Sequence, residues 1–504
     1  MTSFNKVYNL VISAVCMGLA QHPIGLGWIA WFSLVPFFYS IKDENKFSKI
    51  VLYGFTWGFI YHLISLYWLA DNIGVPSRNI GLLTMILANF VCSINIILIL
   101  SIWHLINFLN QKKVWYSLPF IWVTISFLSS LTAVAFPWSD IANTQAQESL
   151  SYFYQFIEFT GMHGLTFWLV LLNVSLFLFL QNKTKESIIE LIYILLLPLI
   201  LGLFTSKNNF NKIDKIEFGI LQPNIHINDK WKNQLMIEKH LSITEKYFDS
   251  LDSDSEEFLL IWPESAFTHN SNQDNYFIKN SFISQKENKI SLITGVGEID
   301  GENNFNSVYF LKNNQNSNLK FAQKYRKMRL VPGAEQVPFS RFFTKLNDLA
   351  ISGNFEYGNE YTTFDYKNSK FASMICIEST FSDLSRNFVN EGANFLVYIA
   401  NDGWYENPPE AQQHAKQTLF RAVETRKPIL RCGNTGISCV VNPSGKVVKS
   451  LKQNSVGFLT SNSVAVFSND FKTLYVVLGN WISYISLIIT SLLFLSGVVK
   501  RYKK

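Results

Sequence analysis

Long apolar runs separated by short polar breaks fill the first two hundred residues, and one more apolar run follows near the end of the chain. Most of them approach or exceed the roughly 20 residues that a helix needs to cross a bilayer. The runs lie near residues 8–21, 26–41, 51–70, 81–108, 114–136, 164–181, 188–205 and 474–499. The pattern predicts eight transmembrane helices, although the first two runs are short and are also compatible with one irregular hairpin.

The stretch between the seventh and eighth runs has a different pattern. Apolar segments suited to strands covered on both faces lie at 216–224, 258–265, 291–299, 307–311, 371–379, 394–402 and 436–443, and helical periodicity appears at 232–250 and 410–426. Strands that alternate with helices favour a layered α/β domain. The expected domains are a membrane domain at 1–205, an α/β domain at 206–470, and an eighth span with a basic tail at 471–504.

Composition supports a membrane class, because 48% of the 504 residues are hydrophobic and only 16% are charged. The net charge of +6 reflects lysines and arginines that flank the spans rather than a nucleic-acid patch. With eight alternating spans, one side receives Lys6, Lys42, Lys46, Lys49, Lys112, Lys113, Lys183, Lys185, Lys500, Arg501, Lys503 and Lys504, whereas the opposite short loops carry only Arg78. The positive-inside rule then places both termini in the cytoplasm and residues 206–470 outside it.

Two predicted strands end in residues with reactive side chains. Glu264 follows "LLIWP" and Cys376 follows "ASMI", and ligands of α/β domains gather where strands end. A helix start after Cys376 would favour the thiolate and supply an oxyanion donor. Taken alone, however, Cys376 is more readily interpreted as a small buried hydrophobe than as a catalytic residue, and Glu264 is also compatible with a turn cap. The other cysteines, at 16, 92, 432 and 439, show no metal spacing, and Cys432 and Cys439 are open to packing or to a disulfide.

A third segment, "KYRKMRLVPGAEQVPF" at 324–339, changes this balance. Together with "WPES" and "MICIES" it resembles the nitrilase, or carbon-nitrogen hydrolase, superfamily, whose Glu-Lys-Cys triad has this chain order. The membrane setting narrows the resemblance to the apolipoprotein N-acyltransferases, as do "LQPNI", "ANDGWY" and "RAVETRKPILRCGNTGIS". The resemblance implies a nitrilase-like sandwich in which Glu264 is the base, Lys327 stabilises the oxyanion and Cys376 is the nucleophile.

The resemblance also implies a reaction and its partners. A phospholipid would donate its acyl chain to Cys376 as a thioester, and the N-terminal amine of a diacylglyceryl apolipoprotein would accept it. Glu335 and Glu378 would support the site, and Trp231 would lie near the acyl chain unless it is only packed. We expect no cofactor and no metal, a monomer, and a multi-pass protein of the bacterial cytoplasmic (inner) membrane with a periplasmic catalytic domain.

Further details concern the loops beside the triad. Phe342 and Phe343 lie in a segment, 339–350, that we expect to enter the lipid interface and gate the site, the alternative being a buried helical turn. The chain departs from the usual family pattern at "PGAE" (332–335), where Pro-Phe-Gly-Glu is usual, and at Ile377, where an aromatic residue is usual.

Three alternatives remain open at the level of sequence. One is a membrane-tethered nitrilase-type amidase that acts on small amides. Another is a non-catalytic membrane protein, although its spans should then carry buried charges and those marked here carry few. The last is a papain-like pair of Cys376 with His414, a histidine that sequence places only on a polar helix face.

Overall fold

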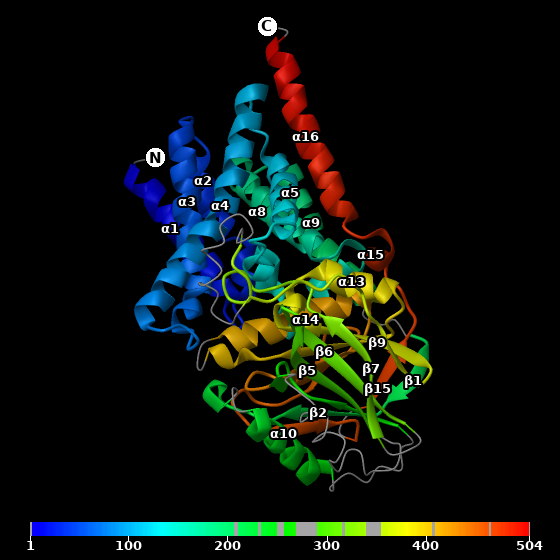
Figure 1. Cartoon of the computed structure of the whole chain (residues 1–504). Helices are drawn as coiled ribbons and strands as arrows, with labels where there is room; N and C mark the ends of the chain where they lie inside the picture. Colours follow the sequence, from blue (N-terminus) through cyan, green and yellow to red (C-terminus); the bar gives the residue numbers. More distant parts are fainter. Residues whose placement is uncertain are drawn as a thin grey trace. The chain divides into compact units, whose positions relative to one another are not determined.

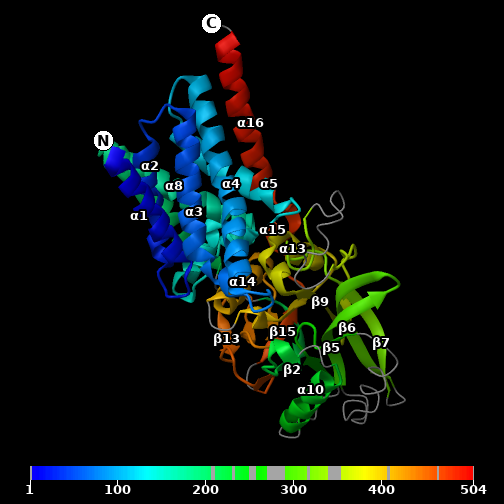
Figure 2. The ribbon, with the colours of Figure 1, turned by 60° about the vertical axis from the view of Figure 1, so that its left-hand side comes forward.

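The computed structural model describes residues 3–205, 210–229, 233–248, 257–268, 290–314, 318–338, 354–405, 409–462 and 465–502. The chain divides into two compact units, each of which is described by itself. A helical unit comprises Met1–Asn208 and Leu478–Lys504, and a mixed α/β unit comprises Asn209–Val477. Figures 1 and 2 show helices alone in the first unit, and strands flanked by helices in the second.

The helical unit is a bundle of long apolar helices. Its longer elements are α1 (Ser3–Gln21), α2 (Leu34–Ile41), α3 (Phe47–Ser65), α4 (Arg78–Asn110), α5 (Leu118–Ser130), α8 (Met162–Asn182), α9 (Lys185–Thr205) and α16 (Trp481–Tyr502), and the short helices α6 (Ser151–Tyr154) and α7 (Ile157–Thr160) lie in one connection. Helix α3 packs between α1 and α4, and α5 packs against α4, α8 and α16. Each predicted span therefore contains a helix.

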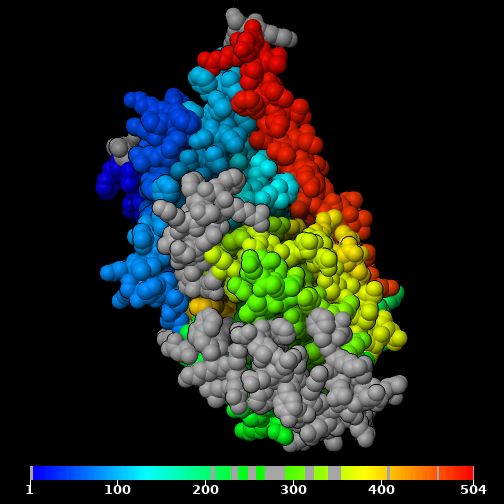
Figure 3. Space-filling model, viewed as in Figure 1, coloured from blue at the N-terminus to red at the C-terminus, as the bar shows by residue number. Residues whose placement is uncertain are grey.

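Four helices of the described chain, α4, α8, α9 and α16, are long and apolar enough to cross a membrane. The helices in the other four predicted segments do not meet both criteria of length and hydropathy, so the number of eight spans stays a prediction. Apolar side chains along α16, such as Ile488, Leu492 and Leu495, are more than half exposed. The red helix is uncovered along much of its length in Figure 3, as expected for a surface that lipid covers.

Two glycines one turn apart allow α3 to approach α4 closely. A Cβ atom built on Gly54 would lie 3.2 Å from the Cα of Ile97, and one built on Gly58 would lie 3.1 Å from the Cα of Ser93. This Gly-x-x-x-Gly spacing is a common device for packing membrane helices, because a bilayer gives apolar side chains no hydrophobic reason to associate.

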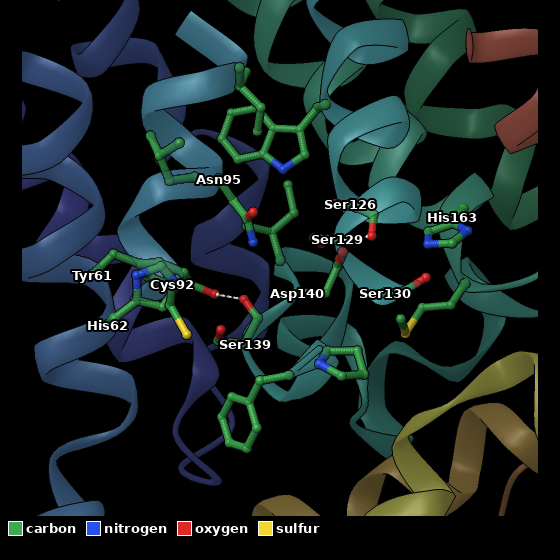
Figure 4. A pocket seen from close by; sticks show the side chains of 17 residues that line it. Tyr61, His62, Cys92, Asn95, Ser126, Ser129, Ser130, Ser139, Asp140 and His163 are labelled. Atoms are coloured by element: carbon green, nitrogen blue, oxygen red, sulfur yellow. Dashed lines mark hydrogen bonds between the residues drawn. The ribbon is translucent and has the colours of Figure 1, made fainter. Parts of the chain in front are cut away.

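The helical unit also contains a small polar pocket of about 60 Å³, lined by residues of α3, α4, α5, the 136–141 connection and the start of α8. Figure 4 shows Asn95, Ser126 and Asp140 around this space, and a hydrogen bond of 2.6 Å from the Tyr61 hydroxyl to the carbonyl oxygen of Ser139. Asp140 accepts hydrogen bonds from Ala142 N at 2.9 Å and from the Thr166 hydroxyl at 2.6 Å. The pocket is therefore framed by polar groups that fasten the connection to its neighbouring helices.

The α/β unit contains two large sheets. One has the strand order β14-β2-β3-β5-β6-β7, with β4 beside β5, and the other has the order β13-β12-β11-β10-β9-β8. The bounds are β2 (Phe218–Gln222), β3 (Phe258–Ile261), β4 (Phe267–Thr268), β5 (Ile290–Asp300), β6 (Asn303–Asn314), β7 (Asn318–Arg326), β8 (Phe364–Tyr366), β9 (Ser369–Ile375), β10 (Phe395–Ala400), β11 (Ile429–Gly433), β12 (Cys439–Val441), β13 (Val447–Ser450) and β14 (Gly457–Thr460). A separate pair is formed by β1 (Lys212–Ile216) and β15 (Val466–Asn469).

The two large sheets pack face to face. Phe310 of β6 contacts Phe371 of β9 with ring centroids 5.3 Å apart, and the thiol of Cys432 on β11 donates to the carbonyl oxygen of Leu221 on β2 at 3.1 Å. Helix α10 (Asn233–Phe248) covers the outer face of the first sheet through Ile237. Helices α13 (Ser382–Asn390) and α14 (Glu410–Thr425) contact the second sheet, giving a helix–sheet–sheet–helix sandwich (Figure 1).

The structure decides one alternative that the sequence left open and adds strands that it did not predict. Cys432 and Cys439 are both free and buried, so they pack in the core instead of forming a disulfide. Strands β7 and β11 were not among the predicted strands. Strand β7 is the last strand of its sheet and is rich in polar residues, so it lacks the continuous apolar run of the central strands.

The glycine contact between α3 and α4 gives a test of the helical unit. Gly58→Ile should lower the free energy of unfolding in detergent by about 1 to 3 kcal/mol, because a branched side chain cannot fit against the backbone of Ser93. Leu52→Phe, which adds bulk on an exposed face of the same helix, is the matched control. Equal thermal stability of the Gly58 variant and wild type would contradict this packing.

Candidate active site

The centre of the site is a buried ammonium group between carboxylates. Lys327 directly follows β7, and its side chain is only 1% exposed. Its Nζ lies 2.8 Å from Oε1 of Glu335 and 3.6 Å from Oε1 of Glu264. Burial by itself disfavours the charged lysine, but the two carboxylates outweigh this effect and raise the pKa of Lys327 above its usual value. The lysine is therefore cationic at any pH that the protein meets.

Asn306 of β6 joins the two carboxylates. Its Nδ2 group donates to Oε1 of Glu264 and to Oε1 of Glu335, both at 2.8 Å. The second oxygen of Glu335 accepts from Val331 N at 2.8 Å, which fastens the loop that carries this residue. Each carboxylate oxygen named here thus faces a donor, as a buried carboxylate requires.

Glu264 lies in the turn after β3, and the neighbouring strand leaves room for it. A Cβ atom on Gly295 of β5 would lie 2.5 Å from the Cα of Glu264, so only glycine permits this approach. Oε2 of Glu264 accepts a hydrogen bond from the backbone N–H of Asn401, which directly follows β10, at 2.9 Å. Glu264 is therefore held by residues from both sheets.

Cys376 lies where β9 ends and a 3₁₀ turn (Cys376–Thr380) begins. Its φ of 52° is in the left-handed region, which residues other than glycine rarely adopt and which often marks a functional site. Burial and the charge of Glu264 raise the pKa of the Cys376 thiol well above its usual value, and Lys327 opposes them. The resting Cys376 side chain is consequently a neutral thiol, and the charges of Glu264 and Lys327 act on it in opposite directions.

Glu378 connects the lysine segment to the cysteine strand. Its Oε1 accepts from the Tyr325 hydroxyl at 2.6 Å and from Met328 N at 2.7 Å, and its Oε2 accepts from Ile375 N at 2.8 Å. Burial nevertheless raises the pKa of Glu378 above its usual value. The side chain thus bonds backbone groups beside Lys327 and beside Cys376, not the lysine ammonium itself.

A buried histidine contacts the backbone of Cys376. Nδ1 of His414, on α14, lies 2.8 Å from Oδ1 of Asp402, and Nε2 lies 2.9 Å from the carbonyl oxygen of Cys376. Arg431 lies 3.2 Å from the other oxygen of Asp402. Burial and Arg431 lower the pKa of His414, while His414 and Arg431 together hold the pKa of Asp402 below its usual value despite burial.

By distance alone, Cys376, Asp402 and His414 could hold a metal ion, since their ligand atoms lie within 4.8 Å of one another. The contacts do not favour this use. Both ring nitrogens of His414 already face protein oxygens, and Asp402 is engaged by His414 and Arg431. The expectation of a site without metal stays a prediction.

The structure places the sequence-predicted residues as follows. It brings Glu264, Lys327, Cys376 and Glu335 together, with Glu378 behind them, whereas Trp231, Phe342 and Phe343 lie outside the described residues. Nε2 of His414 faces the carbonyl oxygen of Cys376, so the geometry differs from a papain-like pair, in which the imidazole faces the thiol. Asn306, Asn401 and Asp402 were not predicted; "ANDGWY" contains two of them and was the one available signal.

Comparison with protein families gives two matches that follow each other along the chain. Residues 13–175 match the model described as apolipoprotein N-acyltransferase N-terminal domain, and residues 219–463 match the model described as carbon-nitrogen hydrolase. Both matches fall within the units that the structure separates: the first within the helical unit and the second within the α/β unit.

Relatives align over both parts. The chain is 26% identical to the apolipoprotein N-acyltransferase of Geobacter metallireducens over 87% of this chain and 85% of the relative. It is 27% identical to the enzyme of the same name from Thermotoga maritima over 96% of this chain and 92% of the relative. Among solved structures, a Saccharomyces cerevisiae member of branch 10 of the nitrilase superfamily is 20% identical with a TM-score of 0.36, covering 50% of this chain and 90% of that one.

The nitrilase-like sandwich, the membrane-type helices and the order of the two family matches agree with one another. Relatives of one name align over most of the chain. The chain therefore belongs to the apolipoprotein N-acyltransferase family, acyltransferases of the carbon-nitrogen hydrolase superfamily.

Proposed function

We propose that the protein moves an acyl chain from a phospholipid, through a thioester on Cys376, to the N-terminal amine of diacylglyceryl-cysteine in lipoproteins. The observation that carries the proposal is the buried Glu264–Lys327–Glu335 cluster beside a thiol in a left-handed backbone conformation. Glu264, Lys327 and Cys376 are the proposed catalytic residues, and Glu335 and Glu378 are proposed to position them.

The first half-reaction forms the thioester. Glu264 accepts the thiol proton while the sulfur attacks the ester carbonyl carbon, so that deprotonation accompanies attack and no free thiolate has to accumulate. The carbonyl oxygen becomes an oxyanion, which the Lys327 ammonium stabilises together with a backbone N–H after Cys376. Such donors are worth roughly 3 to 4 kcal/mol each in well-formed sites. The bond from the carbonyl carbon to the glycerol oxygen then breaks, and Glu264 returns its proton to the departing lysophospholipid.

The second half-reaction repeats this sequence with an amine. The acceptor nitrogen attacks the thioester carbon, its proton passes to Glu264, and the carbon–sulfur bond breaks to leave an amide. The proton on Glu264 then restores the Cys376 thiol. Because both substrates are lipids that react in turn, they need not occupy one pocket together. Water must be kept from the thioester, since it would otherwise hydrolyse.

The membrane setting suits these substrates. We propose that eight spans place the basic loops in the cytoplasm and the α/β unit on the periplasmic side of the inner membrane, where lipidated acceptors reside. The four membrane-type helices and the exposed apolar face of α16 support membrane insertion. Anchored in the bilayer, the enzyme would meet both substrates by lateral diffusion. Trp231 near the acyl site and a gate at Phe342 and Phe343 remain part of this proposal.

A membrane-tethered amidase would share the triad, but the N-terminal family match favours the acyltransferase. Acyl release from phospholipid, compared with release of ammonia from simple amides, separates the two. Turnover of amides without acyl transfer from phospholipid would reject the proposal.

His414 and Asp402 are proposed to position the nucleophile. A hydrogen bond from Nε2 to the Cys376 carbonyl oxygen stabilises the unusual backbone conformation of Cys376, and it polarises the following peptide group, whose N–H is the expected oxyanion donor. Asp402 in turn orients the imidazole ring. The histidine thus acts through the nucleophile and does not take the thiol proton.

The thioester can be detected directly. Incubation of the wild-type protein with phospholipid should add the mass of one acyl chain, and peptide mapping should locate it on Cys376. Cys376→Ala should carry no adduct, because no sulfur is left to form it. An adduct that persists on Cys376→Ala would exclude the proposed nucleophile.

Glu264→Gln should separate proton transfer from thiol acidity. Acyl transfer should fall by about 10²- to 10⁴-fold because the base is lost. The apparent pKa for alkylation of Cys376 by iodoacetamide should decrease, because among the nearby charges Glu264 raises the pKa of this thiol the most. The pH profile of alkylation measures the second effect, and an unchanged or higher pKa in the variant would contradict this electrostatic arrangement.

If His414 positions Cys376, two substitutions of this histidine should slow acyl-enzyme formation to different extents. His414→Leu should slow acyl-enzyme formation by about tenfold or more, while His414→Gln, which retains an N–H donor on a side chain of similar reach, should recover part of the rate. Single-turnover kinetics give the rates, and thermal unfolding serves as the control for stability. Wild-type rates in His414→Leu, or equal losses in both variants at equal stability, would argue against this role.

A further inference from the structure

A second pocket, of about 310 Å³, lies within the α/β unit where β2, β10 and β11 end. Asn224, His226, Gly403, Tyr405, Thr435 and Asn454 are among the residues that line it. Its volume falls at the lower end of the roughly 300 to 1,000 Å³ that is usual for ligand pockets. Polar loops at the carboxyl ends of strands are also where α/β sheets place their ligands.

Hydrogen bonds connect this pocket to the catalytic residues. Asn224 N donates to the carbonyl oxygen of Asn434 at 3.1 Å, and Nδ2 of Asn434 donates to Oδ1 of Asn401 at 3.1 Å. Asn401 N in turn holds Glu264 at 2.9 Å. On the opposite wall, Gly403 directly follows Asp402, the partner of His414. A ligand in the pocket would therefore lie beside the residues that orient the base and the nucleophile.

The lining is polar but carries no formal charge from Asp, Glu, Lys or Arg among the described residues. A phosphate group is normally bound by arginine or lysine, and neither is among the described lining residues. Asparagine and threonine side chains, in contrast, offer the donor and acceptor groups that pair with peptide N–H and C=O. The Asn224 amide and the Thr435 hydroxyl make no side-chain hydrogen bond to the part of the chain that the structure describes, although each is half-buried in the wall.

We propose that this pocket binds the uncharged peptide backbone that follows the lipidated cysteine of the acceptor, and that the phospholipid headgroup binds elsewhere. The inference rests on the proposed function and adds to it the substrate class of one subsite. The acceptor peptide and the phospholipid headgroup would then bind to different polar residues, although both substrates react at Cys376. The enzyme can then select an acceptor by its peptide without constraining the donor.

The test compares two acceptors in separate half-reactions. One is diacylglyceryl-cysteine amide, and the other is diacylglyceryl-cysteine followed by four small neutral residues. Thr435→Val removes a hydroxyl at nearly constant shape, and Asn224→Gly removes an amide while tolerating the φ of 51° at this position. Thr363→Val, a threonine outside the pocket lining, is the control.

In wild type, the peptide acceptor should have the lower KM. The double variant Asn224→Gly/Thr435→Val should raise that KM by about tenfold, with acyl-enzyme formation from phospholipid and transfer to the cysteine amide unchanged. Normal acyl-enzyme formation also shows that the variant is folded.

Three results would overturn the inference: no preference of wild type for the peptide acceptor, equal losses with both acceptors, or a loss confined to acyl-enzyme formation. The last of these would assign the pocket to the phospholipid headgroup. If wild type forms no acyl-enzyme from phospholipid at all, the proposed function fails instead, so the two failures are distinguishable.

Discussion

The buried ammonium of Lys327 is the constraint on which the rest of the site depends. A lysine that is 1% exposed loses almost all of its hydration, and only close carboxylates make its charged form stable there. Glu264 and Glu335 supply them, and Asn306 holds both carboxylates in place. Removing one member would leave an uncompensated buried charge, at a cost of about 3 to 5 kcal/mol. The cluster therefore fixes the turn after β3, the residue after β7 and the 331–335 loop as one body.

The same cluster predicts that the Cys376 thiol, the proposed nucleophile, is unreactive at rest. Two carboxylates surround one ammonium, so the excess charge near Cys376 is negative, and this charge adds to burial in keeping the thiol protonated. A neutral thiol is a poor nucleophile and resists oxidation and alkylation. In the proposed mechanism, Cys376 is activated only when a substrate carbonyl is present, because the Lys327 charge then stabilises the developing oxyanion. Suppressed resting reactivity would suit the periplasmic location proposed above, because that compartment is oxidising.

Much of the sandwich was predictable, because its central strands are continuous apolar runs that end in the reactive residues. What the sequence could not reveal depends on contacts between distant segments. The sequence of helix α14 is rich in polar residues, which predicts an exposed helix. In the structure, however, His414, Arg421 and Glu424 are buried, because charged and polar side chains pair with one another there. Hydrophobic periodicity cannot detect such pairs. For the same reason Asn306 and Asn401 were missed: their importance lies in which carboxylate they face. In the helical unit, helices occupy every predicted span, but length and hydropathy support only four of the described ones as membrane-crossing.

In the proposed reaction, Glu264 accepts and returns a proton in each of the two half-reactions, and its surroundings are suited to that. Both of its described hydrogen-bond partners, Asn306 Nδ2 and Asn401 N, are donors, so neither can take the proton away. In the proposed reaction, the proton accepted from the thiol passes to the glycerol oxygen, and the proton accepted from the amine passes to the sulfur. Because the Asn401 side chain also accepts a hydrogen bond from the Asn434 side chain, the residues that hold Glu264 are linked by hydrogen bonds to the wall of the second pocket. An acceptor bound there would act on the same framework that returns Glu264 to its starting state.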